Sequence, residues 1–120
     1  MTVEQLNQRR GHELLPKALR ETLPPIYTNE ALGLNAIALV KFFTPMSNWT
    51  WNASEFDQDD QLFGLVAGHD VELGYFSLSE FEALERSGLS LIERDLHWTP
   101  DTLGNLMEQH GKTRWDTPVR

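Results

Sequence analysis

The stretch at residues 49–78 reads WTWNASEFDQDDQLFGLVAGHDVELGYFSL. Residues 49–54 alternate apolar and polar side chains, which is the period-two pattern of a strand with one packed and one solvated face. An acidic turn at 57–60 leads to the apolar run 62–67, and a short Gly-His-Asp turn leads on to the run 71–78. Strand-like runs joined by tight turns predict an antiparallel meander.

The flanking sequence extends this meander. Residues 37–44 carry apolar groups on both alternating faces, as in a strand inside a sheet, and a Pro-Met-Ser-Asn turn joins them to the next run. Residues 89–98 alternate again and are a candidate fifth strand. Nearer the N-terminus, the spacing of the apolar residues predicts a short amphipathic helix at about 15–22, which Pro24-Pro25 would end.

Two further helices are predicted after the strands. Ser79 is a candidate N-cap with Glu82 at the third helical position, a capping box, and Gly88 is placed to stop this helix. A second helix would start at Thr99-Pro100-Asp101 and end at Gly111. We therefore expect an α+β fold: a four- to five-stranded antiparallel meander sheet with a short N-terminal helix and two C-terminal helices packed on it.

Length and composition fit one domain. The chain has 120 residues, of which 40% are hydrophobic, and this is enough for one core but not for two. We expect a flexible leader at 1–12, a single α+β domain at 13–111 and a flexible tail at 112–120.

Composition excludes several kinds of site. The chain has no cysteine, so disulfides, thiolate zinc sites and thiol nucleophiles are ruled out. It has no apolar run of about 18–20 residues and no signal-peptide core near its N-terminus, so we expect a cytoplasmic protein that does not use the membrane. It has no phosphate-binding glycine loop and no serine nucleophile elbow, and we expect no cofactor.

Negative charge is concentrated in one segment. The chain has 10 Lys and Arg against 18 Asp and Glu, a formal net charge of -8. Residues 42–85 contain nine carboxylates and no Lys or Arg, which makes their net charge -9. Such a field repels nucleic-acid phosphates and favours basic proteins, although solubility alone also explains it. An acidic binding face would consist of Glu55, Asp57, Asp59, Asp60, Asp70, Glu72, Glu80, Glu82 and Glu85.

Trp49 and Trp51 stand on the same side of one predicted strand. Tryptophan is favoured both in cores and at the centres of interfaces. Core packing is the first interpretation. The two rings would form the centre of a binding surface only where the helices left their side of the sheet uncovered.

Five residues are the candidates for a metal-assisted hydrolase or nuclease: His69, Asp70, Glu72, Asp95 and His97. Imidazole and carboxylate groups are common metal ligands. In a strand, however, Asp70 and Glu72 point to one face and His69 to the other. Solvated turns and edges explain these residues better, so we predict no metal site and no catalytic residues.

Several motifs, in order, resemble the domain-of-unknown-function family 2958. They include LLPK at 14–17, KFFTP at 41–45, VELGYFSL at 71–78 and IERD at 92–95, and the resemblance runs from about residue 13 to 107. It implies a bacterial protein encoded on plasmids and integrated mobile elements, with an accessory role inside the host. No activity or catalytic set comes with this family.

Three functional hypotheses follow. The first is a small, acidic, non-catalytic accessory protein that inhibits a host defence system, in the manner of an anti-CRISPR or antirestriction protein, through an acidic face that mimics nucleic acid. Its partner would be a host or defence-system protein with a basic surface, and it would not bind nucleic acid directly. The alternatives are the metal-assisted hydrolase or nuclease, and a structural or regulatory homodimer joined through an exposed sheet edge or the tryptophans.

Overall fold

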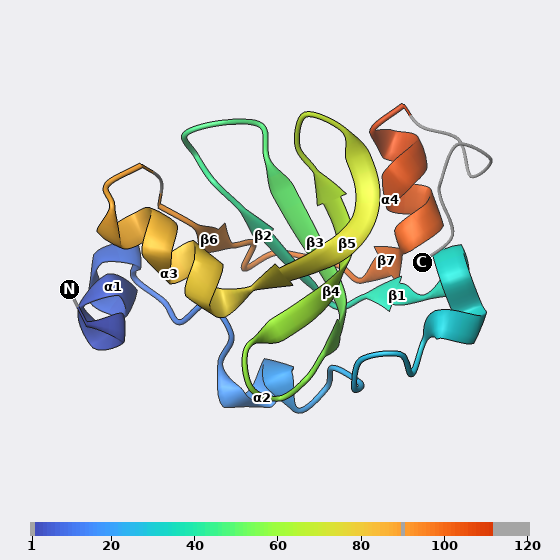
Figure 1. Ribbon diagram of the computed structural model, residues 1–120, viewed down its shortest axis with the longest axis horizontal. Helices are drawn as coiled ribbons and strands as arrows, with labels where there is room; N and C mark the ends of the chain where they lie inside the picture. Colours follow the sequence, from blue (N-terminus) through green and yellow to red (C-terminus); the bar gives the residue numbers. More distant parts are fainter. Residues whose placement is uncertain (1, 90, 112–120) are drawn as a thin grey trace.

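A five-stranded antiparallel sheet forms the centre of the molecule (Figure 1). The computed structural model describes residues 2–89 and 91–111. The strand order is β5-β4-β3-β2-β6, and the strands are β2 (Val40–Phe43), β3 (Thr50–Phe56), β4 (Gln61–Ala67), β5 (Val71–Ser77) and β6 (Glu93–Arg94). Consecutive strands β2 to β5 are neighbours, so the predicted meander is confirmed, and β6 is the expected fifth strand.

The first predicted strand is two strands in the structure. β1 (Ile37–Ala38) pairs with β7 (Asp101–Thr102) in a separate two-stranded sheet, whereas β2 joins the main sheet. The chain changes sheets at Leu39, whose N–H donates to the carbonyl of Ala53 at 2.8 Å. The prediction of one strand over 37–44 is therefore wrong. The physical reason is that Ala38 and Val40 belong to two different hydrophobic clusters, which are described next.

Two hydrophobic clusters lie on opposite faces of the sheet. The α3-side cluster consists of Leu14, Leu15, Leu23, Val40, Phe42, Trp51, Ala53, Phe56, Leu62, Phe76, Phe81 and Ile92. The α4-side cluster consists of Ala36, Ala38, Leu65, Leu103, Leu106 and Met107. Leu62 and Leu65 come from one strand at positions of opposite parity, so their side chains point to opposite faces.

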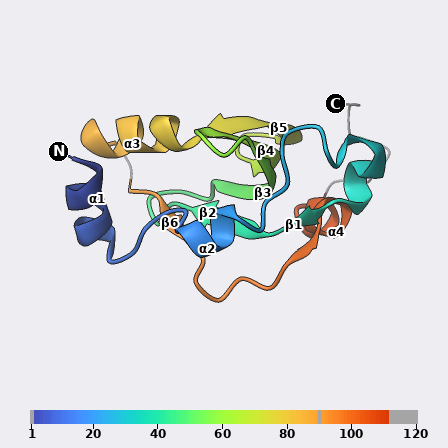
Figure 2. The same ribbon diagram turned by 90° about the horizontal axis from the view of Figure 1, so that it is seen from below.

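The helices take up these two faces. α3 (Leu78–Arg86) buries Phe81 in one cluster, and α4 (Leu103–Gln109) buries Leu103, Leu106 and Met107 in the other. Figures 1 and 2 show α3 toward one end of the long axis and α4 toward the other. The short helix α2 (Lys17–Arg20) and the 3₁₀ helix η1 (Glu30–Asn35) precede the strands. The α+β prediction is thus confirmed, with the two C-terminal helices on different faces.

The N-cap of α3 is Ser77 and not Ser79. The Ser77 side chain accepts a hydrogen bond from the N–H of Glu80, as an N-cap does. Ser79 instead donates its N–H and its hydroxyl to the carboxylate of Asp60. The helix therefore begins directly after the last residue of β5.

The segment predicted as a flexible leader contains helix α1 (Val3–Arg10). Thr2 and Gln5 form a capping box at its start, and Gly11 closes it in the left-handed conformation. Leu6 is fully buried, and the Arg10 side chain reaches Glu85 on α3. A flexible leader at 1–12 does not describe this helix. The predicted tail at 112–120 lies outside the described residues.

Candidate functional site

Two of the nine carboxylates proposed for an acidic face are buried. Glu55 is 0% exposed, and its carboxylate accepts the N–H groups of Tyr27 at 3.0 Å and of Asn29 at 2.7 Å. It thereby holds a loop in which Tyr27 adopts a positive φ of 73°. Bonds from two backbone donors explain how a carboxylate can be buried here. Glu55 supports the fold and is not available to a binding partner.

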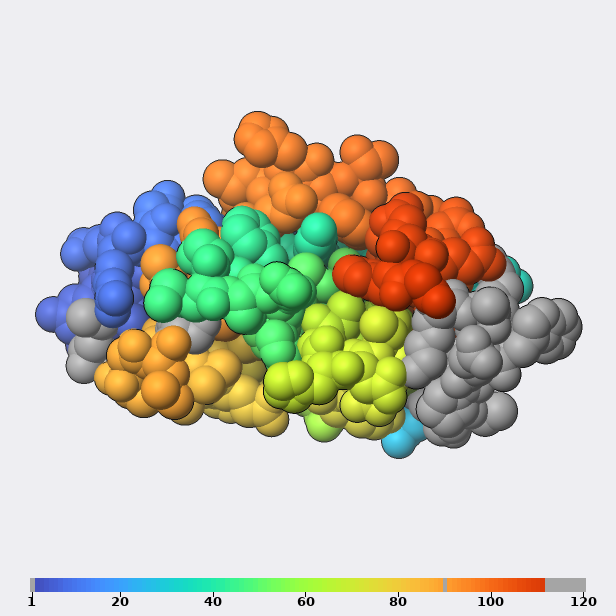
Figure 3. All heavy atoms as spheres, turned by 90° about the horizontal axis from the view of Figure 1, so that it is seen from above, coloured from blue at the N-terminus to red at the C-terminus, as the bar shows by residue number. Residues whose placement is uncertain are grey.

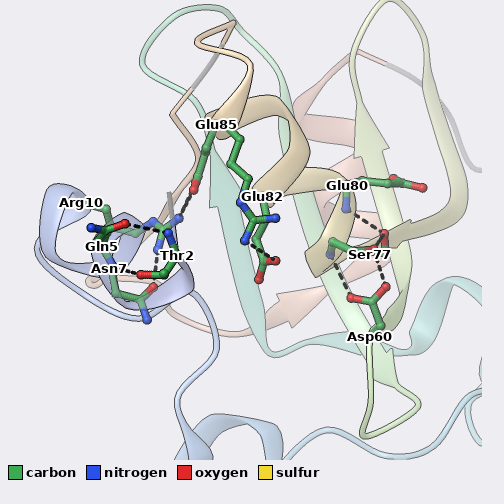
Figure 4. Close-up of polar contacts among 11 residues, drawn as sticks. Thr2, Gln5, Asn7, Arg10, Asp60, Ser77, Glu80, Glu82 and Glu85 are labelled. Carbon is green, nitrogen blue, oxygen red and sulfur yellow. Dashed lines mark hydrogen bonds and ion pairs between the residues drawn. The ribbon is translucent and has the colours of Figure 1, made fainter.

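Glu85 is the second buried carboxylate. It forms an ion pair with Arg10 of α1, and the side chains are 0% and 1% exposed (Figure 4). Glu85 also accepts the N–H of Ile92 at 3.1 Å, and Arg10 donates through Nε to the carbonyl of Ile92 at 2.8 Å. These contacts join α1, α3 and the segment before β6.

In the β3–β4 turn, the exposed side chain of Asp57 stabilises the turn by accepting hydrogen bonds from its backbone. Asp57 Oδ1 accepts the N–H groups of Asp59, Asp60 and Gln61 at 2.8–3.0 Å. Desolvation raises the pKa of Asp57, but these hydrogen bonds more than offset it, so the pKa lies below its ordinary value. Asp60 is bonded to Ser79, which brings this turn beside Glu80 at the start of α3.

The remaining acids lie elsewhere. Asp70 and Glu72 belong to the β4–β5 turn and the start of β5, which β4 separates from the β3–β4 turn by about 20 Å at roughly 3.4 Å per residue. Figure 3 shows the β4–β5 turn (yellow-green) beside the β2–β3 turn (green). On α3, Glu82 pairs with Arg86 at 3.9 Å. The nine carboxylates therefore do not form one continuous face.

The five metal candidates are also divided. His69, Asp70 and Glu72 lie at or next to the outer strand β5, whereas Asp95 and His97 follow β6 at the other edge of the sheet. Asp95 accepts the N–H of His97 at 2.9 Å, which is a local turn contact. In the described part of the chain, no group of three or more His, Asp or Glu side chains is arranged to hold a metal ion.

The tryptophans are packed mainly in the core. Trp51 is 8% exposed, and its ring centroid lies 4.9 Å from that of Phe81. Trp49 is half-buried and meets the exposed His69 edge-on at 5.3 Å. Because α3 covers this side of the sheet, Trp51 cannot serve as the interface residue considered from sequence.

A pocket of about 120 Å³ lies between α1 and α3, and its lining includes Arg10, Glu13, Arg20 and Glu82. Both arginines are already engaged, since Arg10 bonds to Glu85 and Arg20 donates to the carbonyl of Leu15. Neither arginine is therefore positioned to bind an anionic ligand in this pocket.

Sequence reasoning missed the polar residues that organise the N-terminal region. His12 Nε2 accepts the N–H of Arg94 at 3.0 Å, which connects the segment after α1 to β6. Partial burial, followed by the charges of Arg94 and Arg10, lowers the pKa of His12, so the neutral form that can accept this bond is favoured. The local sequence pattern carries no signal for these contacts, because the two residues of each contact are 82 positions apart in the sequence.

The outer edge of β5 is the most distinctive surface of the sheet. β5 pairs with β4 through seven residue pairs without a bulge, and among the described strands β4 is its one partner. Natural edge strands are usually short, bulged, or marked by Lys or Pro. The other outer strand, β6, follows this rule with two residues. β5 has seven residues, no Lys, no Pro and a single charge, at Glu72.

The ladder shows which peptide groups of β5 face outward. Gly68 N bonds to Asp70 O at one end of the β4–β5 hairpin, and Leu78 N bonds to Asp60 O at the other. Hydrogen-bonded pairs alternate in an antiparallel ladder, so the even-numbered residues of β5 bond to β4. The peptide groups of Val71, Leu73, Tyr75 and Ser77 therefore point away from β4. One outward donor, Val71 N, is bonded to the Asp70 side chain at 2.8 Å.

Fold and surface together define a small α+β protein with a long, regular sheet edge and, among its described residues, no group of side chains arranged to hold a metal ion. The chain belongs to the family described as protein of unknown function (DUF2958), whose model matches residues 14–109. Helix α1 precedes the matched segment. No curated protein and no solved structure matches the chain. Within the residues described, no helix has the length and apolar character that crossing a membrane requires.

Proposed function

We propose that this chain is a non-catalytic protein that acts by binding another protein, and that the outer edge of β5 is its binding element. An extended segment of the partner would add to the sheet as a further strand next to β5. The observation that carries this proposal is that β5 is a regular seven-residue strand at the edge of the sheet and has no bulge, Lys or Pro, the features that usually protect such an edge.

The arrangement of the polar residues supports binding over catalysis. Catalytic groups must converge on one position within hydrogen-bond reach of a substrate. Here the imidazole and carboxylate candidates are split between the two edges of the sheet. Several carboxylates that could have been reactive instead hold backbone groups of loops and turns.

Interference with a host defence system is part of this proposal only through the family resemblance. An extended nucleic-acid mimic needs carboxylates spread over one face. The two buried acids and the separation of the two acidic turns weaken that mechanism. We therefore place the binding element on β5 and treat the exposed acids as a source of solubility and of preference for basic partners.

The test uses two substitutions at Leu73, whose peptide group faces outward. Leu73→Pro removes the outward N–H while leaving the bonds to β4, and proline is tolerated at such edge positions. Leu73→Ala loses a comparable side chain but keeps the N–H. Captured proteins from host lysate would be identified, purified and titrated against the wild-type chain and both variants.

The expected result is a loss of about tenfold or more in affinity with Leu73→Pro and at most about twofold with Leu73→Ala, since one main-chain bond and the close approach of the strands are lost. Circular dichroism and thermal melting verify that both variants are folded. Equal affinities for the two variants, or no specific partner at any salt concentration, would contradict the proposal.

A further inference from the structure

We infer that the N-terminal segment is a pH-sensitive latch: a neutral His12 ring holds helix α1 and the residues after it against β6, and protonation of the ring weakens this contact. Opening of the latch would uncover the outer edge of β6, which lies across the sheet from β5. The inference goes beyond the proposed function and does not depend on it, because it concerns the other edge of the sheet.

The ladder between β2 and β6 shows which peptide groups face outward. The N–H of Asp95, directly after β6, donates to the carbonyl of Lys41 on β2 at 2.9 Å. Hydrogen-bonded pairs alternate in an antiparallel ladder, so the peptide groups of Ile92 and Arg94 point away from β2. Such an edge could pair with another strand unless it is covered.

Three side chains bond to these outward groups. Arg10 donates through Nε to the carbonyl of Ile92 at 2.8 Å, and Glu85 of α3 accepts the N–H of Ile92 at 3.1 Å. His12 Nε2 accepts the N–H of Arg94 at 3.0 Å. The edge of β6 is therefore covered by side chains of α1, of α3 and of the segment after α1.

His12 is the member of this set whose charge can change near neutral pH. Histidine ordinarily titrates there, whereas arginine stays charged. The ring is half-buried and lines an open hollow together with Glu4 and Gln8 of α1, so water can reach it. A neutral ring that accepts through Nε2 carries its proton on Nδ1. With a proton on both nitrogens, the ring can no longer accept the N–H of Arg94.

The charged groups around His12 come from α1, the residue after His12, α3 and β6: Glu4, Arg10, Glu13, Glu85, Glu93 and Arg94. Partial burial, followed by the charges of Arg94 and Arg10, lowers the pKa of His12, and Glu93 offsets this only in part. Arg10 is held by Glu85, and the guanidinium of Arg94 donates to the carbonyl of Glu13 at 3.4 Å. Both cations therefore stay beside the ring.

The lowered pKa of His12 sets the direction of the pH dependence. The closed form binds fewer protons than the open form, in which the ring regains its ordinary pKa of 6.5. The contribution of the latch is thus present above about pH 6.5 and is lost as the pH falls toward the pKa of the closed form. From pH 7 to pH 5 the opening equilibrium can rise by at most about 25-fold, the limit reached when the open form alone takes up the proton.

The experiment compares the wild-type chain with His12→Gln, whose side-chain oxygen can accept the N–H of Arg94 but does not titrate. His97→Gln is the matched control, because His97 is exposed and lies beyond the end of β6. Hydrogen exchange of the backbone amides of Leu6, Arg10 and Arg94 is followed by NMR at pH 7 and pH 5 and is corrected for intrinsic exchange rates. The amides of β3 and β4 report on unfolding of the whole sheet.

In the wild-type chain and in His97→Gln, protection of the three amides should fall by about threefold to 25-fold between pH 7 and pH 5. In His12→Gln it should change by less than about twofold. At both pH values these amides should be at least about tenfold less protected than those of β3 and β4, as local opening requires. Nitrogen-15 shifts of the wild-type ring should show the Nδ1–H form at pH 7 and a titration midpoint below 6.5.

The inference is overturned by an equal pH dependence in the wild-type chain and His12→Gln, or by equal protection of α1 and the sheet. A wild-type ring that carries its proton on Nε2 at pH 7 also overturns it, and this measurement needs no variant to fold. The effect of Leu73→Pro on partner binding is a separate result that bears on the proposed function of β5 alone.

Discussion

Among single residues, Gly64 and Gly74 form a matched pair for mutation. They lie opposite each other in the β4–β5 ladder, yet their surroundings differ. A Cβ atom at Gly64 would lie 1.8 Å from the backbone oxygen of Asn52 on β3, whereas a Cβ at Gly74 would meet nothing within 4 Å. The obstacle at Gly64 is main chain, so it cannot move as the end of a side chain can.

We therefore expect Gly64→Ala to lower the free energy of unfolding by about 1–3 kcal/mol, the usual cost of overpacking. Gly74→Ala should leave it unchanged or raise it by about 0.5 kcal/mol, because alanine has less freedom to lose on folding. Urea unfolding of both variants measures the difference. Similar losses for the two alanines would mean that the β3–β4 approach is not as close as described.

Residue burial was the level at which sequence reasoning failed most. The pattern around Trp51 predicts a solvated face for Asn52 and Ser54, yet both are buried and bond to carbonyls of β4. Glu55 and Glu85 resemble the exposed acids beside them in sequence. Apart from the nearby N–H of Ile92, the donors that allow this burial lie 26 to 75 positions away, such as Asn29 and Arg10. Counting charges along the chain cannot reveal such partners.

At the scale of elements, helix α1 depends on one buried ion pair. Removing one member of such a pair leaves the other charge buried without compensation and typically costs about 3–5 kcal/mol. We expect Arg10→Met to destabilise the protein by about this amount, because the buried Glu85 carboxylate would lose its partner. Adding Glu85→Gln should recover much of the loss, since glutamine is neutral and can still accept the N–H of Ile92.

A double-mutant cycle by urea unfolding tests this account of α1. The two single variants and the double variant should give a coupling energy of at least about 1–2 kcal/mol. Additive effects would instead indicate that Arg10 and Glu85 act independently, and that Leu6 packing alone holds the helix in place.

The elements that sequence predicted best are those with local signals. Alternation and tight turns are properties of adjacent residues, and the meander from β2 to β5 was predicted from them. Helix α1 has local cap signals in Thr2, Gln5 and Gly11, but its apolar pattern is weak, because Val3 and Leu6 are its only apolar residues and a polar arginine completes its buried side. The break between β1 and β2 was missed for a related reason: a run apolar on both faces does not show that its two halves pair with different strands.

At the scale of the whole molecule, the question is whether two clusters on opposite faces fold as one unit. The molecule is elongated, with extents of 42 × 29 × 23 Å, and α3 and α4 lie toward opposite ends (Figure 1). Separate clusters at the ends of an elongated chain could in principle unfold separately. Here β4 contributes Leu62 to one cluster and Leu65 to the other, three residues apart.

Loss of either cluster would therefore leave one face of β4 uncovered, and we expect a single cooperative transition. Trp51 reports on the α3-side cluster and Trp98, which packs against the α4-side cluster, reports on the other. The test uses two variants, each of which keeps one of these tryptophans and has phenylalanine in place of the other three. Urea unfolding of each variant is followed by fluorescence and by circular dichroism. Within each variant, the two transitions should coincide. A fluorescence transition of the Trp98 variant well below its circular dichroism transition would show that α4 and its cluster unfold first. In that case the shared strand would not couple the two faces, and the stability of the β5 edge would depend on the α3 side alone.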